Sequence, residues 1–223
     1  MSERTIGILG LGIFGTSIVH TLKNYDCQII AVDNREAHIN AVAPYLTQGI
    51  IGDITDFELL EAAGIDTCDA VVISTGSSLE ASVLAVMHCK NLGVSEVIAK
   101  ATSDIAAQVL IKVGADDVIS PEKEMGIAVA KQVLFPSTTD FVSIDENLSI
   151  VEFYPPESWL NHSLIEIPLR QTYQMNLIGY RTDGSQRIKT NLTRDYRFKD
   201  TERLLAVIDN DRFDQLKGLS NLK

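Results

Sequence analysis

The chain begins with an apolar strand that runs into a glycine-rich loop and then into a helix. The predicted strand covers residues 5–9, the loop reads Gly10-Leu-Gly12-Ile-Phe-Gly15, and helical spacing of apolar residues begins at Phe14. Gly10 allows a tight turn, Gly12 lets a phosphate approach the backbone, and Gly15 lets the helix pack on the strand. Free N–H groups at the helix N-terminus attract anions. This order predicts a Rossmann-like nucleotide-binding unit.

Alternation of strands and helices continues as far as residue 120. Five further apolar strands are predicted over residues 28–32, 49–51, 70–75, 97–100 and 117–120. Five intervening helices make this an α/β fold with a doubly wound parallel sheet. A crossover helix is expected over 122–135, and Pro136 with the small polar residues after it marks a domain boundary. We therefore expect a nucleotide-binding domain over 1–136 and a second domain over 137–223.

The second domain has a different pattern, which predicts a small α+β fold. Strands are expected over 141–144, 150–154 and 203–208, and a short helix over 163–170. Residues 176–181 and 186–189 predict a hairpin around the Asp183-Gly184 turn. A terminal helix is expected over 211–216.

Composition limits the partners of the chain. A formal net charge of −11 disfavours nucleic acid and direct binding to anionic lipid. No apolar run approaches the roughly 20 residues of a membrane span, and the first residues show no signal-peptide pattern. The three cysteines are scattered and predict buried apolar side chains. We expect a cytoplasmic protein with no membrane insertion of its own.

Polar side chains follow several of the predicted strands, at the sheet edge where such folds bind ligands. Asp33 comes 18 residues after Gly15. A carboxylate at this place accepts hydrogen bonds from ribose hydroxyls and repels a 2′-phosphate, which disfavours NADP. Asp53 and Thr75 follow the next two strands, and Lys100 ends the fifth, where it can neutralise phosphate. Two simpler interpretations stay open: Asp53 as a helix cap and Lys100 as a solvated lysine.

Catalytic patterns are missing from the sequence. His20, His38 and His88 fall on predicted helices, His162 lies in the second domain, and none is expected beside a strand end with a partner. There is no P-loop, no Gly-x-Ser-x-Gly and no HExxH. The pattern therefore favours a nucleotide that acts as a signal, and a protein that is not an enzyme. The alternatives are an NAD-dependent oxidoreductase and a ligand-sensing domain of another transport or transcription system.

Six stretches in this order resemble the Ktr/Trk family of potassium-uptake regulatory proteins, and they cover nearly the whole chain. They read IGILGLGIFGTSI, IIAVD, GDITDFELLEAAGIDTCDAVVISTG, VIAKA, GADDVISPEKEMG and LIEIPLRQTYQMNLIGYR. The likeness is to the short KtrA type of RCK (regulator of potassium conductance) protein. It implies a homodimer that assembles into an octameric ring beneath a membrane potassium-translocating subunit of the KtrB/TrkH type. It also implies an RCK N-lobe that binds ATP, ADP or NAD(H), and a C-lobe that binds cyclic di-AMP.

The resemblance assigns residues to the nucleotide pocket of the N-lobe. They are Gly10, Gly12, Ile13, Phe14, Gly15, Asp33, Asp53, Thr75 and Lys100. Glu122 matches a glutamate that helps to bind a divalent cation, Mg²⁺ or Ca²⁺; its alternative role is a first-turn carboxylate stabilised by the helix dipole. Ile13 stands where ATP-sensing members carry arginine, which makes ADP or NAD the more plausible ligand.

The resemblance also assigns a cyclic di-AMP site to the C-lobe. Its residues are Leu164, Ile165, Leu169, Arg170 and Asn176. The apolar side chains would sandwich the adenines, and Arg170 would pair with phosphate. Pro168 stands where relatives often have aspartate. The alternative is an apolar dimer interface with a surface arginine.

Overall fold

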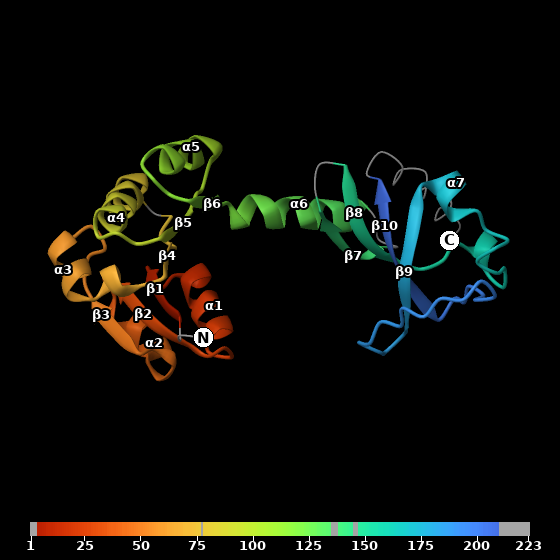
Figure 1. The fold of residues 1–223 in the computed structure, drawn as a ribbon, viewed down its shortest axis with the longest axis horizontal. Helices are drawn as coiled ribbons and strands as arrows, with labels where there is room; N and C mark the ends of the chain where they lie inside the picture. The colour runs from red at the N-terminus through yellow and green to blue at the C-terminus, as the bar shows by residue number, and fades with distance from the viewer. Residues whose placement is uncertain (1–3, 77, 135–137, 145–146, 210–223) are drawn as a thin grey trace. The chain divides into compact units, whose positions relative to one another are not determined.

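The computed structural model describes residues 4–76, 78–134, 138–144 and 147–209 (Figure 1). The chain forms two compact units, Met1–Lys123 and Glu124–Lys223. Helix α6 (Pro121–Leu134) crosses this division. The functional domains expected over 1–136 and 137–223 stay a prediction. In the described part of the chain, no helix is both long and apolar enough to cross a membrane.

The first unit is built on a six-stranded sheet in which every neighbouring pair of strands is parallel. Its strands are β1 (Arg4–Leu9), β2 (Cys27–Asp33), β3 (Gln48–Ile51), β4 (Ala70–Ile73), β5 (Glu96–Lys100) and β6 (Asp117–Ile119). Their order is β3-β2-β1-β4-β5-β6. From β1 the chain therefore adds β2 and β3 on one side of β1. It then returns to the other side of β1 and adds β4, β5 and β6 there. This confirms the doubly wound fold and places a topological switch point between β1 and β4, where ligands bind.

Helices cover both faces of this sheet, so both faces of its strands are buried. They are α1 (Ile13–Leu22), α2 (Glu36–Val42), α3 (Phe57–Ala62), α4 (Leu79–Asn91) and α5 (Asp104–Lys112), with short 3-10 turns η1 (Ala43–Tyr45) and η2 (Ile65–Thr67). Successive residues of β1 enter different cores: Ile8 packs in one apolar cluster and Leu9 in the other. Asp56, Ser78 and Ser103 cap α3, α4 and α5 by accepting a backbone N–H three residues later.

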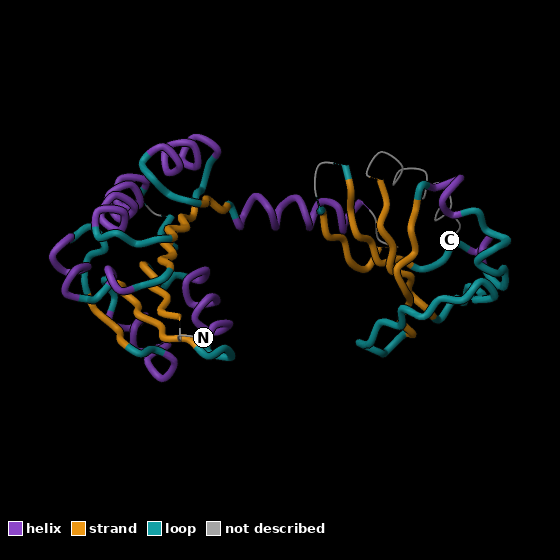
Figure 2. The backbone as a smooth tube through the Cα atoms, in the orientation of Figure 1, coloured by secondary structure: helices purple, strands orange, loops and turns teal. Residues whose placement is uncertain are grey.

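The second unit is a four-stranded antiparallel sheet with short helices, drawn in Figure 2. Its strands β7 (Thr138–Ser143), β8 (Leu148–Phe153), β9 (Met175–Thr182) and β10 (Glu202–Asp209) lie in the order β7-β8-β10-β9. The helical segments are η3 (Glu157–Trp159) and α7 (Leu169–Tyr173). Trp159 and Phe198 are almost fully buried against Met175 and Leu204 of the sheet. The small α+β fold is therefore confirmed.

The predicted position of the short helix, over residues 163–170, is wrong. Helix α7 begins only at Leu169, because Pro168 disfavours a helical backbone at the residue before it. The preceding residues form a turn in which the Ser163 N–H and hydroxyl both donate to Glu166 Oε2, at 2.5 and 2.8 Å. The terminal helix expected over 211–216 lies outside the described residues.

The hairpin predicted around Asp183-Gly184 is correct in its turn and wrong in its second strand. The chain turns at Asp183-Gly184, where Gly184 has a φ of 78°, but residues 186–189 form no strand. Ser185 Oγ accepts the N–H of Arg187 at 3.2 Å, and this local bond takes the backbone away from a ladder. A single bridge between Tyr180 and Lys189 remains. Strand β9 forms its ladder with β10 instead.

Candidate nucleotide-binding site

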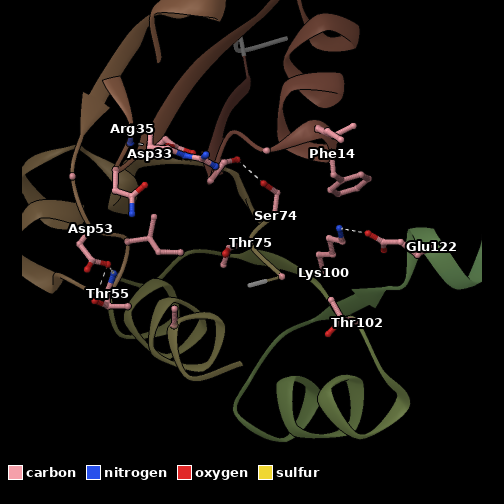
Figure 3. A pocket seen from close by; sticks show the side chains of 18 residues that line it. Phe14, Asp33, Arg35, Asp53, Thr55, Ser74, Thr75, Lys100, Thr102 and Glu122 are labelled. Atoms are coloured by element: carbon pink, nitrogen blue, oxygen red, sulfur yellow. Dashed lines mark hydrogen bonds and ion pairs between the residues drawn. The ribbon is translucent and has the colours of Figure 1, made fainter. Parts of the chain in front are cut away.

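A cavity of about 600 Å³ lies at the carboxyl ends of the central strands of the first unit (Figure 3). Nine of the ten residues predicted for the nucleotide and its cation line it: Gly10, Gly12, Ile13, Phe14, Asp33, Asp53, Thr75, Lys100 and Glu122. They come from the last residues of β2 and β5 and from the segments that follow β1, β3, β4 and β6. The fold therefore brings together residues that are more than 100 positions apart in the sequence. Gly15 lies outside this lining.

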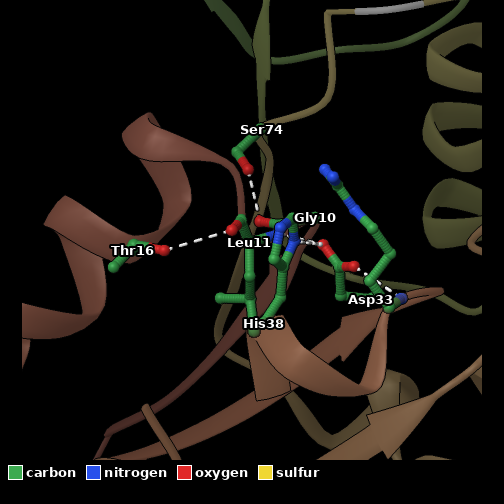
Figure 4. Close-up of polar contacts among 7 residues, drawn as sticks. Gly10, Leu11, Thr16, Asp33, His38 and Ser74 are labelled. Carbon is green, nitrogen blue, oxygen red and sulfur yellow. Dashed lines mark hydrogen bonds and ion pairs between the residues drawn. The ribbon is translucent and has the colours of Figure 1, made fainter. Parts of the chain in front are cut away.

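Gly10 and Gly15 are required by the packing of the loop itself. Gly10 has a φ of 95°, a conformation that disfavours side chains, and its carbonyl accepts the Ser74 hydroxyl at 2.5 Å (Figure 4). A Cβ on Gly15 would lie only 2.2 Å from the Gly10 carbonyl oxygen. Helix α1 can therefore approach β1 and β4 only with glycine at position 15, as the sequence predicts.

Gly12 is different, because a Cβ there would meet no protein atom within 4 Å. It is the N-cap residue of α1, and no side chain caps this helix end. Its position at the cavity leaves first-turn N–H groups available to a ligand phosphate. Ile13, beside it, is 93% exposed and supplies no charge. The geometry is that of a phosphate loop without an arginine.

Asp33 holds the loop and the start of helix α2 together. Its Oδ2 accepts the Leu11 N–H at 2.6 Å and contacts His38 Nδ1 at 3.1 Å, and its Oδ1 accepts the Arg35 N–H at 2.8 Å (Figure 4). Burial raises the pKa of Asp33, but the bonds from Leu11, Arg35 and His38 outweigh burial and leave that pKa lowered. Asp33 is therefore a buried, ionised acceptor at the edge of the cavity.

Lys100 and Glu122 form an ion pair on the other side of the cavity, drawn in Figure 3. Lys100 Nζ lies 2.5 Å from Glu122 Oε1 and 5.8 Å from the centre of the Phe14 ring. The Lys100 side chain is only 13% exposed, so the solvated-lysine interpretation is wrong. The hydrogen bond from Lys100 is the main cause that lowers the pKa of Glu122, and a backbone hydrogen bond lowers this pKa further.

A metal role for Glu122 stays a prediction. No three His, Cys, Asp or Glu side chains in the described ranges form a group able to hold a metal ion. Carboxylate oxygens suit Mg²⁺ and Ca²⁺, and both metals also accept phosphate or water oxygens as ligands.

Asp53 lines the cavity through a local turn rather than as a helix cap. Its Oδ1 accepts the N–H and the hydroxyl of Thr55, at 2.9 and 2.8 Å, and both bonds lower the pKa of Asp53. Asp56 caps helix α3 instead, so the capping interpretation of Asp53 is wrong. The carbonyl of Thr55 lies 3.0 Å from His88 Nε2, which fixes this loop to helix α4.

The sequence missed part of the site. His38 has a partner at a strand end, so the expectation that no histidine does is wrong. Arg35, Ser74 and Thr102 also line the cavity. Arg35 carried a usable signal, because it lies two residues after the predicted ribose acceptor Asp33.

The second unit contains a smaller cavity of about 330 Å³. It is lined by Leu164, Ile165, Ile167, Pro168, Leu169, Arg170, Gln171, Met175 and Leu177. Four of the five residues predicted to bind cyclic di-AMP therefore line the same cavity: Leu164, Ile165, Leu169 and Arg170. Asn176 does not line this cavity, because side chains alternate along β9 and Met175 and Leu177 point to it.

The family model of the TrkA-N domain matches residues 6–121, more than half of the chain. The chain belongs to the TrkA-N family. Ktr system potassium uptake protein A of Vibrio alginolyticus is 31% identical over 179 residues, which cover 80% of this chain and 81% of that protein. Ktr system potassium uptake protein C of Bacillus subtilis is 29% identical over 177 residues, with coverage of 79% and 80%. These relatives confirm the KtrA-type resemblance of this TrkA-N family chain.

Solved structures agree on the fold. The RCK domain of GsuK superposes with a TM-score of 0.66 at 15% identity, over 99% of this chain and 48% of that one. The TrkA-N domain of ybaL from Escherichia coli matches with a TM-score of 0.53 at 14% identity, over 60% and 98% of the two chains. An RCK fold therefore extends over both units of the chain.

Proposed function

We propose that this chain is the cytoplasmic, nucleotide-sensing regulatory subunit of a potassium uptake system. The observation that carries the proposal is the cavity at the switch point, where the glycine loop, Asp33 and Lys100 meet. The Ktr relatives, matched over about four fifths of both chains, supply the transport role.

The ligand of the cavity is an adenine nucleotide, either ATP, ADP or NAD(H). First-turn N–H groups of α1 take its phosphates, Asp33 accepts from its ribose, and Lys100 lies where it can neutralise phosphate. Support comes from structural neighbours: one GsuK structure is the channel bound to NAD, with a TM-score of 0.65. The Kef C-terminal domain of Shewanella denitrificans is in an AMP-bound form, with a TM-score of 0.50. When a divalent cation is bound, Glu122 would supply it with a carboxylate oxygen beside the phosphates.

The nucleotide is a signal in this proposal, and the chain is not an enzyme. Each histidine has a structural partner: His38 binds Asp33, His88 contacts Thr55 and His162 contacts the Leu160 carbonyl. His20 packs edge-on against Tyr45. None of the four lines the 600 Å³ cavity, so none is placed there as a general acid or base for the alternative, an NAD-dependent oxidoreductase.

Homodimers of the chain form an octameric ring on a membrane potassium-translocating subunit of the KtrB/TrkH type. Exchange of nucleotide in the first unit changes the ring and so gates the membrane subunit. Cyclic di-AMP acts through the second unit, where the 330 Å³ cavity offers apolar walls and the guanidinium of Arg170. Two copies of that cavity related by a two-fold axis match the symmetry of the ligand.

The test is potassium uptake in cells that lack their own uptake systems. A KtrB-type subunit is expressed alone, with this chain, or with its Gly12→Ala variant, and rubidium influx is measured at micromolar potassium. Influx should rise with the wild-type chain and stay at the basal level with the variant, while Asp66→Asn, an exposed site away from the cavity, behaves as wild type. Equal influx with and without the chain, together with no co-purification of the two proteins, contradicts the proposal.

A further inference from the structure

Arg35 brings a cation to the Asp33 side of the cavity. It follows Asp33 by two residues, it is exposed, and it lines the cavity. Within the described part of the chain, no carboxylate forms an ion pair with its guanidinium. Figure 3 shows Arg35 beside Asp33, with Lys100 and Glu122 on the other side. The lining therefore carries one cation on each side of the cavity.

The Asp33 carboxylate already accepts hydrogen bonds from the protein. Three donors, from Leu11, Arg35 and His38, surround its carboxylate, and its side chain is only 8% exposed. A carboxylate excludes a 2′-phosphate through repulsion and through its own need for donors. The protein already supplies these donors, so the exclusion of NADP predicted from Asp33 rests on charge repulsion, which the guanidinium of Arg35 can offset.

A guanidinium binds phosphate with two parallel hydrogen bonds, which an ammonium cannot do. An arginine near the ribose is also the device by which dinucleotide-binding folds accept a 2′-phosphate. We propose that Arg35 determines which ribose the cavity accepts, and that it makes a 2′-phosphorylated adenine nucleotide, of the NADP class, bind at least as tightly as its unphosphorylated counterpart. The inference rests on the proposed function, because it names the nucleotide class of the same cavity.

Isothermal titration calorimetry of the full chain tests this with two ligand pairs. The pairs are NAD with NADP, and AMP with adenosine 2′,5′-bisphosphate; the second pair removes the nicotinamide half. In the wild type, the 2′-phosphorylated member of each pair should bind with equal or lower dissociation constant. Arg35→Ala should weaken that member by about tenfold or more and change the other by less than about threefold. Arg35→Lys should fall between, since it keeps the charge and loses the fork.

Arg187→Ala is the matched control, because Arg187 is an exposed arginine of the second unit and its loss changes net charge equally. It should leave all four affinities within about twofold of wild type. The inference is overturned if wild type binds NAD more than about twofold tighter than NADP, or if Arg35→Ala weakens both members of a pair equally or neither. If none of the four ligands binds, and ATP and ADP also fail to bind, the proposed nucleotide function itself fails, which is a separate result.

Discussion

Replacing Asp33 with asparagine tests whether this carboxylate holds the nucleotide loop in place. The side chain is nearly the same size, so no cavity forms. Asparagine keeps one carbonyl oxygen and puts an NH₂ group where the second carboxylate oxygen was. If the oxygen continues to accept from Leu11, the NH₂ group faces the Arg35 N–H, and two donors oppose each other.

The magnitude follows from this geometry. At least one charge-assisted bond to a group whose side chain is 8% exposed is lost, which costs about 1.5–3 kcal/mol of unfolding free energy. The same bonds keep the pKa of folded Asp33 below the ordinary aspartate value of about 3.9. The stabilisation is therefore complete above that value and is lost as the pH falls through the lower, folded pKa. The difference between wild type and variant should be full at pH 7 and shrink below about pH 4.

Urea unfolding of the ligand-free protein, followed by circular dichroism at pH 7 and at pH 3.5, measures the stability. Calorimetry measures the affinity for ATP, ADP and NAD, and all three should weaken together, because the proposed contact of Asp33 is with a ribose that they share. Asp66→Asn is the control; this exposed aspartate lies outside the glycine loop and the cavity lining, and its replacement should shift the unfolding free energy by less than about 0.5 kcal/mol. An unfolding free energy of Asp33→Asn equal to wild type at pH 7 would refute the reasoning.

Four other substitutions test the remaining parts of the two cavities. Gly12→Ala should leave the unfolding free energy within about 0.5 kcal/mol and weaken nucleotide binding by about tenfold or more, because its Cβ would meet no protein atom within 4 Å and Gly12 lines the cavity. Gly15→Ala should lower the unfolding free energy by about 1–3 kcal/mol, since its Cβ would strike the loop backbone; equal stability of the two alanine variants in urea would be the contrary result. Unmodified protein should bind ATP and ADP within about tenfold of each other in calorimetry, and Ile13→Arg should shift that ratio toward ATP; an unshifted ratio rules out a phosphate contact at position 13. Arg170→Ala should weaken cyclic di-AMP binding to the full chain and spare nucleotide binding, and loss of neither affinity would leave Arg170 as a surface residue.

Much of the first unit could be predicted because its local signals agree with its tertiary structure. Buried parallel strands must be apolar on both faces, and strands such as Ala70–Ile73 are continuous apolar runs. The carboxyl ends of these strands share one edge, so the polar residues after them had to meet. For this reason nine of the ten residues predicted for the nucleotide and its cation line one cavity, although the prediction used no side-chain positions.

The second unit was harder to predict from the sequence, because some of its elements depend on single local hydrogen bonds. The Ser185 turn removes a strand that alternation and the Asp-Gly turn both indicate. Asn176 was assigned to the smaller cavity by resemblance alone. The period-two rule, applied to Met175 and Leu177, would have placed it on the opposite face of β9.

Pairing among the site residues could not be read from the sequence, and it decides the electrostatics of the cavity. His38 lies five residues after Asp33, at a place where the first turn of α2 returns toward the strand end. Lys100 and Glu122 are 22 residues apart and meet only because β5 and β6 are neighbours. Glu122 is paired with Lys100 and Asp33 accepts three hydrogen bonds, so both carboxylates already have partners within the protein. A phosphate that enters on the Lys100 side must compete with Glu122 for the same ammonium group. We therefore expect a bound nucleotide to act on the Lys100–Glu122 pair and, through Glu122, on the first turn of α6.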